Sequence, residues 1–433
     1  MFKINHQNIL KGKIGPKNGL DEGALKKFCV NAQSHVGTIL KSADKEGYAF
    51  LKLPDNAKLI DQIRRFAAGQ KKYQWENIIV LGIGGSALGV TAIKETLLGC
   101  FHDITHKPRL IVVDNIDPVF VTNAAEHLDM KKTLFIVISK SGGTVEPLAL
   151  YALAKEKMEK LVGKNWQKHF VFITDPVDGL LRKMATDDKI TAFEIPPKVG
   201  GRFSVLSAVG LVPASLVALD VTGLLRGAKL MRGYIEKNKG IENPALLLAA
   251  TQYLMDKEKG KPMTVIMPYC NELFRVADWY RQLLAESIGK NIKTGPTPIN
   301  ALGTTDQHSQ VQLWNEGPDN KLVIFLRVLK HATDLKIGHN LPKPMDFLNG
   351  KNLSAILDAS YVGTSESLVK SGRPNLTIDI PKIDAVTLGA LFMLFEFQVA
   401  LLGLLYGVNA FDQPGVEHGK QITKKLLSST RVK

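Results

Sequence analysis

Two loops rich in glycine and hydroxyl side chains are the first candidates for chemistry in this chain of 433 residues. Each follows an apolar, β-branched run: IIVLGIGGS at residues 78–86 and LFIVISKSGGT at residues 134–144. Glycine lets backbone N–H groups approach an anion closely, and a following helix adds the positive end of its dipole. We therefore predict that the loops bind one small phosphate group. The candidate hydroxyl donors are Ser86, Ser139, Ser141 and Thr144.

Two kinds of nucleotide site compete with this interpretation. The triphosphate motif G-x-x-x-x-G-K-[ST] fails at Lys140, because neither required glycine precedes it. A dinucleotide site stays open, since Gly82-x-Gly84-x-x-Ala87 fits the looser G-x-G-x-x-G/A fingerprint and Asp114 ends the next predicted strand. Ordinary strand-to-helix turns would also explain either loop if it stood alone.

A third candidate is the arginine of KVGGRFSVLSAVG (198–210). Gly200 and Gly201 allow a sharp turn of the backbone, which would present Arg202 outward. A guanidinium in that position could hold an oxyanion. A lone arginine is more often part of a surface ion pair, so both interpretations of Arg202 remain at this point.

The segment NELFRVADWYRQLLAESIGK (271–290) predicts a helix with two polar residues on one face. Gln282 and Glu286 are four residues apart and therefore lie side by side. Gly289 is a candidate C-cap, which puts Glu286 near the helix C-terminus, where the dipole disfavours a carboxylate. This placement favours proton acceptance by Glu286, with an effect of only about 0.3–1 kcal/mol.

The segment GTTDQHSQVQLW (303–314) offers a candidate acid or base. Thr305 or Asp306 could cap a helix whose first turn carries His308. A helix N-terminus disfavours the imidazolium form, which leaves a neutral ring able to donate or accept a proton. The chain has 10 histidines, and most histidines have no such role, so the position alone decides nothing.

The segment AFDQPGVEHGK (410–420) supplies a candidate lysine. Pro414 is typical of a first helical turn, with Asp412 or Gln413 as its cap, and Lys420 follows Val416 by one turn. A solvated polar face that also carries Glu417 and His418 would explain the same residues.

Alternating strand and helix patterns indicate the scaffold that would position these groups. Apolar runs separated by helical stretches are typical of a doubly wound parallel sheet. In the first half of the chain they occur at 77–82, 109–114, 133–139, 169–174 and 190–195. In the second half the strand candidates are 263–268, 321–328 and 376–380. The very apolar stretch 385–406 contains Glu396 and Gln398, which indicates a buried core helix.

This pattern predicts an α/β protein with two sheet domains and helical ends. We expect an N-terminal helical segment over 1–57, a first domain over 58–222, a second over 223–408, and a C-terminal helical segment over 409–433 that carries Lys420. A chain of this length has ample residues for substantial cores.

Composition indicates a cytoplasmic enzyme with an acidic substrate. The net charge is +15, from 56 Lys and Arg against 41 Asp and Glu, but the basic residues are spread along the chain and no nucleic-acid module is recognisable. No uninterrupted apolar run approaches the roughly 20 residues of a membrane span, and the N-terminus lacks a secretory apolar stretch. Cys29, Cys100 and Cys270 lack metal-ligand spacing, which favours a reducing compartment. We expect neither a nucleic-acid nor a membrane partner.

Several of these segments together carry a resemblance to a known family. VGGRFS (199–204) and FDQPGVEHGK (411–420), with GIGGS, SKSGGT, AESIGK and the His308 turn, resemble glucose-6-phosphate isomerases of the shorter bacterial type. The resemblance covers nearly the whole chain from about residue 60, in the expected order. It implies two flavodoxin-like sugar-isomerase (SIS) domains, a homodimer, no cofactor, and interconversion of glucose 6-phosphate and fructose 6-phosphate in glycolysis and gluconeogenesis.

The resemblance also implies residue roles in that reaction. Glu286 resembles the base that moves a proton between C1 and C2, and Arg202 resembles the residue beside the enediolate intermediate. His308 and Lys420 resemble the pair that opens the sugar ring, with His308 reaching the neighbouring subunit's site. Polar residues that line the site are Gln282 and Gln413. The phosphate contacts would be Gly85, Ser86, Ser139, Lys140, Ser141 and Thr144.

Two departures from the family pattern concern the phosphate loops. The second loop is Ser-Gly-Gly where longer family members carry bulkier residues, and Ala87 stands where an acidic residue is common. They bear on details of phosphate binding and on the breadth of sugar specificity.

Three other functions remain as alternatives to this isomerase. A phosphosugar-sensing regulator with the same domains could dispense with Glu286, His308 and Lys420, yet all three are present. An NAD-dependent dehydrogenase rests on the loose glycine fingerprint alone. A bifunctional glucose and mannose isomerase is the nearest alternative, because the sequence does not rank the pocket residues that decide it.

Overall fold

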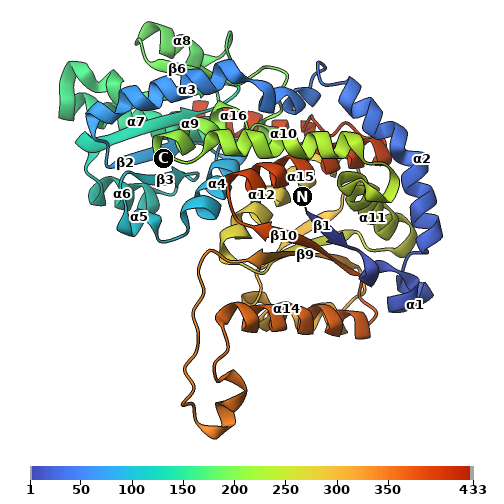
Figure 1. Cartoon of the computed structure of the whole chain (residues 1–433). Coiled ribbons are helices and arrows are strands. Elements are labelled where there is room, and N and C mark those ends of the chain that lie inside the picture. Colours follow the sequence, from blue (N-terminus) through green and yellow to red (C-terminus); the bar gives the residue numbers. More distant parts are fainter. Residues whose placement is uncertain (1, 430–433) are drawn as a thin grey trace.

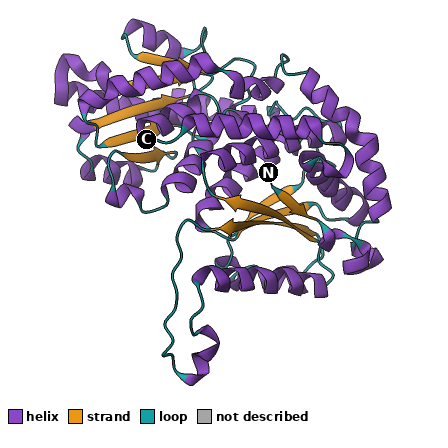
Figure 2. Cartoon of the chain, viewed as in Figure 1, coloured by secondary structure: helices purple, strands orange, loops and turns teal. Residues whose placement is uncertain are grey.

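The computed structural model describes residues 2–429, which form two α/β lobes that lie side by side (Figure 1, Figure 2). The first lobe has a five-stranded, fully parallel sheet in the order β3-β2-β4-β5-β6. Numbered within the lobe, this order is 2-1-3-4-5, the flavodoxin-like arrangement. Its strands are β2 (Asn77–Leu81), β3 (Arg109–Val113), β4 (Thr133–Ile138), β5 (Phe170–Thr174) and β6 (Thr191–Glu194).

The second lobe repeats this arrangement and adds an antiparallel edge. Its order is β1-β10-β9-β7-β8, in which β7 to β10 are parallel and β1 runs antiparallel to β10. The strands are β1 (Lys3–Asn5), β7 (Met263–Pro268), β8 (Thr297–Asn300), β9 (Lys321–Lys330) and β10 (Asn375–Lys382). The segment 1–57, which we expected to be helical, therefore also supplies an edge strand to the distant second sheet. The other domain limits stay predictions.

Helices surround both sheets and connect the lobes (Figure 1). Those following the strands of the first lobe, with the preceding α3, are α3 (Ala57–Gln70), α4 (Leu88–Leu98), α5 (His102–Thr105), α6 (Pro118–His127), α7 (Val145–Val162), α8 (Leu180–Asp187) and α9 (Ala208–Leu216). Those of the second lobe are α10 (Val221–Lys237), α11 (Pro244–Lys259), α12 (Phe274–Ile288), α13 (Val311–Glu316), α14 (Leu353–Lys370) and α15 (Ala385–Tyr406). The ends of the chain contribute α1 (Lys11–Asn18), α2 (Glu22–Lys41) and α16 (Glu417–Ser428).

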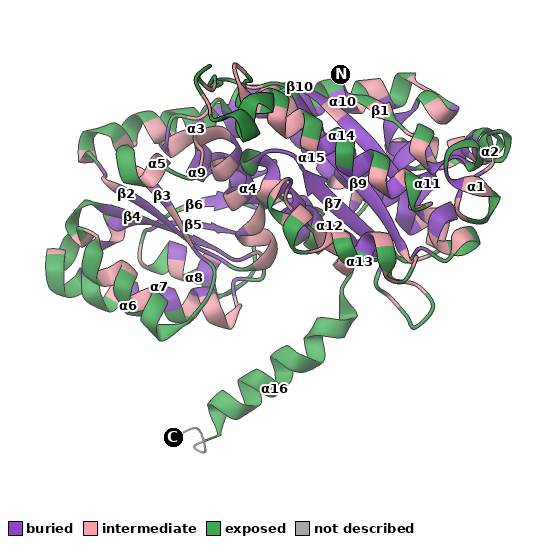
Figure 3. Cartoon of the chain, turned by 90° about the horizontal axis from the view of Figure 1, so that it is seen from below, coloured by how far each residue is buried: buried purple, intermediate pink, exposed green. Residues whose placement is uncertain are grey.

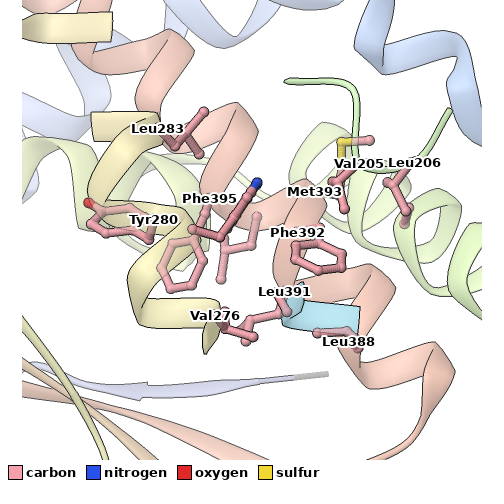
Figure 4. Packing of buried hydrophobic residues seen from close by; sticks show 14 of the residues in the cluster. Val205, Leu206, Val276, Tyr280, Leu283, Leu388, Leu391, Phe392, Met393 and Phe395 are labelled. Carbon is pink, nitrogen blue, oxygen red and sulfur yellow. The ribbon is translucent and has the colours of Figure 1, made fainter. Parts of the chain in front are cut away.

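The main hydrophobic core surrounds α15, as the apolar stretch 385–406 predicted. Its N-cap Asp384 accepts a hydrogen bond from the backbone N–H of Thr387 at 2.8 Å, and Gly407 ends the helix in the left-handed conformation. This helix is long and apolar enough to span a membrane, but 89% of its most apolar window is buried inside the molecule. Aromatic residues of α12 and α15 pack together, with Trp279 against Phe392. Tyr280 lies against Phe395 (Figure 4).

The predicted phosphate loops meet at one edge of the first sheet. β2 and β4 are adjacent and parallel, with Leu81 opposite Val137, so both loops leave the carboxyl edge together. The order in which strands are added to the sheet changes direction between these two strands, since β3 is added beside β2 on one side and β5 beside β4 on the other. Open parallel sheets bind ligands at such a switch point. The helix α12 of the second lobe packs on α4, which brings Glu286 towards the same edge.

Candidate active site

Arg202 is the centre of the site and is almost fully buried, at 4% exposure. It lies in a short 3₁₀ turn, Gly201–Phe203. Its Nε donates to Ser287 Oγ at 2.7 Å, and its Nη2 donates to the carbonyl oxygens of Ala410 and Asp412. The surface ion pair that a lone arginine suggested is therefore wrong. The guanidinium is instead fixed between the two lobes and the C-terminal segment.

The remaining N–H groups of Arg202 point to two residues that the sequence had singled out. Nη1 donates to Gln413 Oε1 at 2.9 Å and lies 3.5 Å from Glu286 Oε2. All five N–H groups of the guanidinium thus have partners, and the Glu286 contact is the longest of them. Burial lowers the pKa of Arg202, and the charge of Glu286 opposes that change. An arginine stays protonated in such surroundings.

Glu286 and Gln282 lie on one face of α12, as their spacing predicted. Gln282 Nε2 donates to Glu286 Oε1 at 3.0 Å. The opposite face of the helix is apolar and packs on α15, because Val276, Tyr280 and Leu283 recur at helical spacing. Gly289 is the C-cap of α12, so the predicted position of Glu286 near the helix end is confirmed. Its side chain is 34% exposed, so the carboxylate is neither fully buried nor fully solvated.

The first glycine loop touches the Arg202 turn directly. Gly84–Ser86 forms a 3₁₀ turn before α4, with Gly84 at a φ of +57°. A Cβ atom at Gly85 would lie 2.4 Å from the carbonyl oxygen of Gly201. Only glycine permits this close approach. Ser86 is half-buried at the end of the turn, next to the N-terminus of α4.

The second loop gathers its hydroxyl groups into one cluster before α7. Ser139 Oγ lies 2.9 Å from Thr144 Oγ1, and Ser141 Oγ lies 3.4 Å from the same atom. Ser139 is buried, Thr144 is half-buried and Ser141 is exposed. Thr144 is also the N-cap residue of α7, although its side chain forms no capping hydrogen bond. The cluster therefore has donors to offer to an anion at the start of the helix.

Lys140 points away from this cluster and towards the Arg202 turn. Its Nζ donates to the carbonyl oxygens of Pro197 at 2.7 Å and Val199 at 2.9 Å. Burial lowers the pKa of Lys140. A pocket beside the turn is lined by residues that include Lys140, Gly200, Gly201, Asp412 and Gln413.

Two predicted site residues are not brought to this centre within the single chain. His308 is exposed, at the last position of the 3₁₀ turn Thr305–His308 and not in the first turn of α13. Thr304 is the N-cap of that turn, where Thr305 or Asp306 was expected. Lys420 lies on the fully exposed helix α16, which projects from the body (Figure 3), and its Nζ is 2.7 Å from Glu417 Oε1.

Sequence reasoning missed several groups that hold the centre in place. Ser287 and the carbonyl groups of Ala410 and Asp412 fix Arg202, and Lys290 Nζ binds Asp412 Oδ1 at 2.9 Å. Backbone acceptors leave no signal in residue types. Ser287 directly follows Glu286 in the sequence, but nothing in its type indicates that it would face an arginine 85 positions away.

Comparisons with known proteins identify the family. The sequence profile described as "Phosphoglucose isomerase" matches residues 52–433. A "Probable glucose-6-phosphate isomerase" of Methanococcus maripaludis is 39% identical, over 100% of this chain and 95% of that protein. A "Glucose-6-phosphate isomerase" of Carboxydothermus hydrogenoformans is 38% identical, over 98% of this chain and 94% of that protein.

A solved structure of a hypothetical protein from Thermus thermophilus has the same fold. Its TM-score is 0.89 at 32% identity, and the match covers 99% of this chain and 100% of that chain. The expected two-sheet α/β fold of phosphosugar isomerases is confirmed by the sheet topology and by these matches. With the profile spanning most of the sequence and relatives aligned over its full length, the chain belongs to the phosphoglucose isomerase family.

Proposed function

We propose that this chain interconverts D-glucose 6-phosphate and D-fructose 6-phosphate through an open-chain sugar and an enediolate intermediate, in glycolysis and gluconeogenesis. The observation that carries the proposal is the pairing of a half-buried carboxylate with a buried guanidinium, Glu286 Oε2 to Arg202 Nη1 at 3.5 Å, beside two phosphate-type loops. A base next to a fixed cation is the combination that proton removal beside a carbonyl requires.

In this proposal Glu286 moves the proton between C1 and C2 of the open chain. Gln282 holds Oε1 of the carboxylate at 3.0 Å, which leaves Oε2 to take the proton. The side-chain amide oxygen Oε1 of Gln282 is buried and has no hydrogen-bond partner among residues 2–429, so it can accept a hydrogen bond from a sugar hydroxyl. Gln413, which lies 2.9 Å from Arg202 Nη1, is the second polar residue of the site.

Arg202 stabilises the negative charge that appears when the proton leaves. Its contact with Glu286 is long and is the one that a substrate oxygen can replace, because Ser287 and two carbonyl groups hold the rest of the guanidinium. A donor fixed in advance gains its full interaction only when the enediolate forms, and such an interaction raises the rate.

The phosphate would bind between the two loops at the switch point of the first sheet. Donors from both loops and the N-termini of α4 and α7 meet there. Because the phosphate is remote from the bonds that change, its binding energy serves to position the open chain. The proposed contacts are Gly85, Ser86, Ser139, Ser141 and Thr144.

Ring opening is assigned to His308 and Lys420 in a homodimer. The His308 side chain is exposed and forms no hydrogen bond within residues 2–429, so it is available to a second chain. α16, which carries Lys420, exposes Ile422, Leu426 and Leu427 on a helix that touches little of its own body. Apolar side chains exposed in this way indicate a partner surface.

A reducing, cytoplasmic location is part of the same proposal. All three cysteines are free, and two of them are buried. Unpaired cysteines are typical of proteins in a reducing compartment.

One coupled assay tests the reaction. Purified protein is mixed with fructose 6-phosphate, and glucose 6-phosphate is detected continuously; mannose 6-phosphate is then supplied in its place. We expect conversion of fructose 6-phosphate without any added cofactor. No conversion by folded, dimeric protein would refute the proposal, and comparable turnover of mannose 6-phosphate would extend it to a bifunctional isomerase.

A further inference from the structure

Lys140 bridges two loops that come from different strands of the first sheet. Its backbone follows β4, and its carbonyl oxygen accepts a hydrogen bond from the N–H of Asp175 at 3.3 Å, just after β5. Its side chain continues to the segment after β6, where Nζ donates to the carbonyl oxygens of Pro197 and Val199. One residue thus connects the carboxyl ends of three strands.

The segment that Lys140 holds leads directly to Arg202. Val199 is followed by Gly200 and Gly201, and the 3₁₀ turn then carries the arginine. The carbonyl oxygen of Lys198, which lies between the two that Lys140 binds, accepts a hydrogen bond from the N–H of Gly47 at 2.8 Å. Three successive carbonyl groups are therefore held by other parts of the chain. Two glycines would otherwise leave this turn free to adopt other conformations.

The ammonium group of Lys140 has backbone carbonyl oxygens as its partners. Within residues 2–429 its only hydrogen bonds are the two to Pro197 and Val199, and it forms no salt bridge. Burying a charge is costly unless it is well hydrogen-bonded. A surface lysine that merely adds positive charge would not need this geometry.

We propose that Lys140 is a positioning residue, which holds the 197–202 turn and thereby fixes the Arg202 guanidinium against Glu286. Because Lys140 stands between Ser139 and Ser141, this inference rests on the proposed function: the loop that binds the phosphate also holds the turn that carries the arginine. In this account the ammonium acts on two carbonyl oxygens, and the phosphate is held by the hydroxyl groups.

The first test compares Lys140→Met with Lys140→Arg in the full-length protein. Methionine keeps most of the side-chain length but cannot donate, so the turn loses two hydrogen bonds. A misplacement of about 1 Å can cost roughly 10²-fold in rate, and we expect kcat to fall by about that factor while KM changes less than threefold. Arginine can still donate to both carbonyl groups, and its kcat should recover to within about tenfold of the wild type.

Lys157→Met is the control. It removes the same charge from an exposed position of α7 in the same lobe, and the Lys157 ammonium also donates to a backbone carbonyl oxygen, that of Ala125, which lies outside the 197–202 turn. We expect less than a threefold change in kcat. An equal loss in Lys157→Met would mean that the loss of any positive charge from this lobe is enough, and it would overturn the assignment.

Two further measurements separate positioning from phosphate binding and from the reaction itself. Calorimetric titration with inorganic phosphate should give the same Kd for wild type and Lys140→Met. Hydrogen exchange of peptides over 196–204 should be faster in the variant, because the amides of Val199 and Phe203 are bonded within this turn. This exchange readout does not depend on catalysis, so it remains informative even if the wild type fails to isomerise fructose 6-phosphate. A tenfold weaker phosphate affinity with unchanged exchange would overturn the proposal.

Discussion

At the scale of single residues, the site is organised around one buried guanidinium. Arg202 uses every N–H group, and three of its acceptors are side chains or carbonyl groups from the stretch 410–413. Glu286 is held from one side by Gln282 and from the other by Arg202. A carboxylate fixed in this way needs little rearrangement to reach a C–H proton, which is the basis of the first prediction.

Replacement of Glu286 by glutamine should abolish most of the activity and spare binding. The amide has the same size but cannot take a proton at neutral pH, and loss of a general base lowers kcat by roughly 10²–10⁴-fold. The Kd for a non-isomerisable six-carbon phosphate should stay within a factor of three. Glu272→Gln, an exposed carboxylate just before α12, is the control. Activity of Glu286→Gln close to that of this control would remove Glu286 as the base.

The double replacement Ser141→Ala and Thr144→Ala should weaken binding of every phosphate ligand alike. Hydrogen bonds to a charged group contribute about 1.5–3 kcal/mol each, so we expect at least a tenfold higher Kd for inorganic phosphate and for sugar phosphates. Thr186→Ala removes an exposed hydroxyl of α8 in the same lobe and serves as the control. Calorimetry that finds unchanged affinities would place the phosphate elsewhere.

At the scale of elements, the sequence predicted all five strands of the first sheet and the central strands of the second, but not the edge strands of the second sheet. The buried, β-branched strands of the first sheet lie within about two residues of their predicted ranges, because no other element type suits an apolar run of that length. β1 and β8 were missed. β1 has only three residues, most of them polar, and β8 contains Pro298. Both strands lie at an edge of the second sheet, where partial burial gives no clear apolar run in the sequence.

Long-range contacts explain most of what sequence reasoning missed in the site. The spacing of Gln282 and Glu286 is a local property of a helix, so it could be predicted. The environment of Arg202 could not be predicted, since Ala410 is 208 positions away and accepts a hydrogen bond through its backbone carbonyl. Lys420 and His308 lie at exposed positions, and the roles proposed for them need a second chain, which no local pattern encodes.

α15 carries a carboxyl group whose burial should make stability depend on pH. Both oxygens of Glu396 are buried and have no hydrogen-bond partner among residues 2–429, and burial raises its pKa well above the usual range. A carboxyl group with a higher pKa in the folded state contributes stability that is complete below its unfolded pKa of about 4.3. That contribution is lost as the pH rises towards the folded pKa.

Glu396→Gln should therefore be more stable than the wild type at neutral pH, by an amount that grows as the pH rises above about 4. Glutamine is nearly the same size as glutamate and does not ionise, so its burial costs the same at every pH. Denaturant unfolding at several pH values measures the difference in the free energy of unfolding between variant and wild type. Glu258→Gln, on an exposed position of α11, should show no such trend. A difference that is constant with pH, or that shrinks as pH rises, would contradict the account.

At the scale of the whole molecule, two segments within residues 2–429 project from the lobes and expose apolar side chains. The long connection between β9 and α14 extends away from the second lobe (Figure 1) and exposes Leu335, Met345 and Phe347. α16 projects from another side with its own apolar residues (Figure 3). Both features are what a chain that pairs with a second copy would show.

A shared site makes a prediction for mixed dimers of Glu286→Gln and His308→Ala chains. In a heterodimer, the site built on the Glu286→Gln chain contains both substitutions, because its His308 position comes from the other chain. The second site combines the intact Glu286 of the His308→Ala chain with the intact His308 of the Glu286→Gln chain. We expect activity to return to as much as half of the wild-type value. Two affinity tags allow the doubly tagged dimer to be isolated and assayed with fructose 6-phosphate. Activity no greater than the sum of the two parent dimers would show that each site belongs to one chain.

The central claim is that Glu286 and Arg202 together carry out proton transfer through an enediolate, and a single nuclear magnetic resonance experiment tests it. The wild-type protein converts fructose 6-phosphate to glucose 6-phosphate in deuterium oxide, and the C2 position of the product is observed. A base that exchanges its proton with solvent delivers deuterium, so we predict a measurable fraction of glucose 6-phosphate labelled at C2, and no label with Glu286→Gln. Product formed without any deuterium at C2 would indicate hydride transfer and would contradict the account.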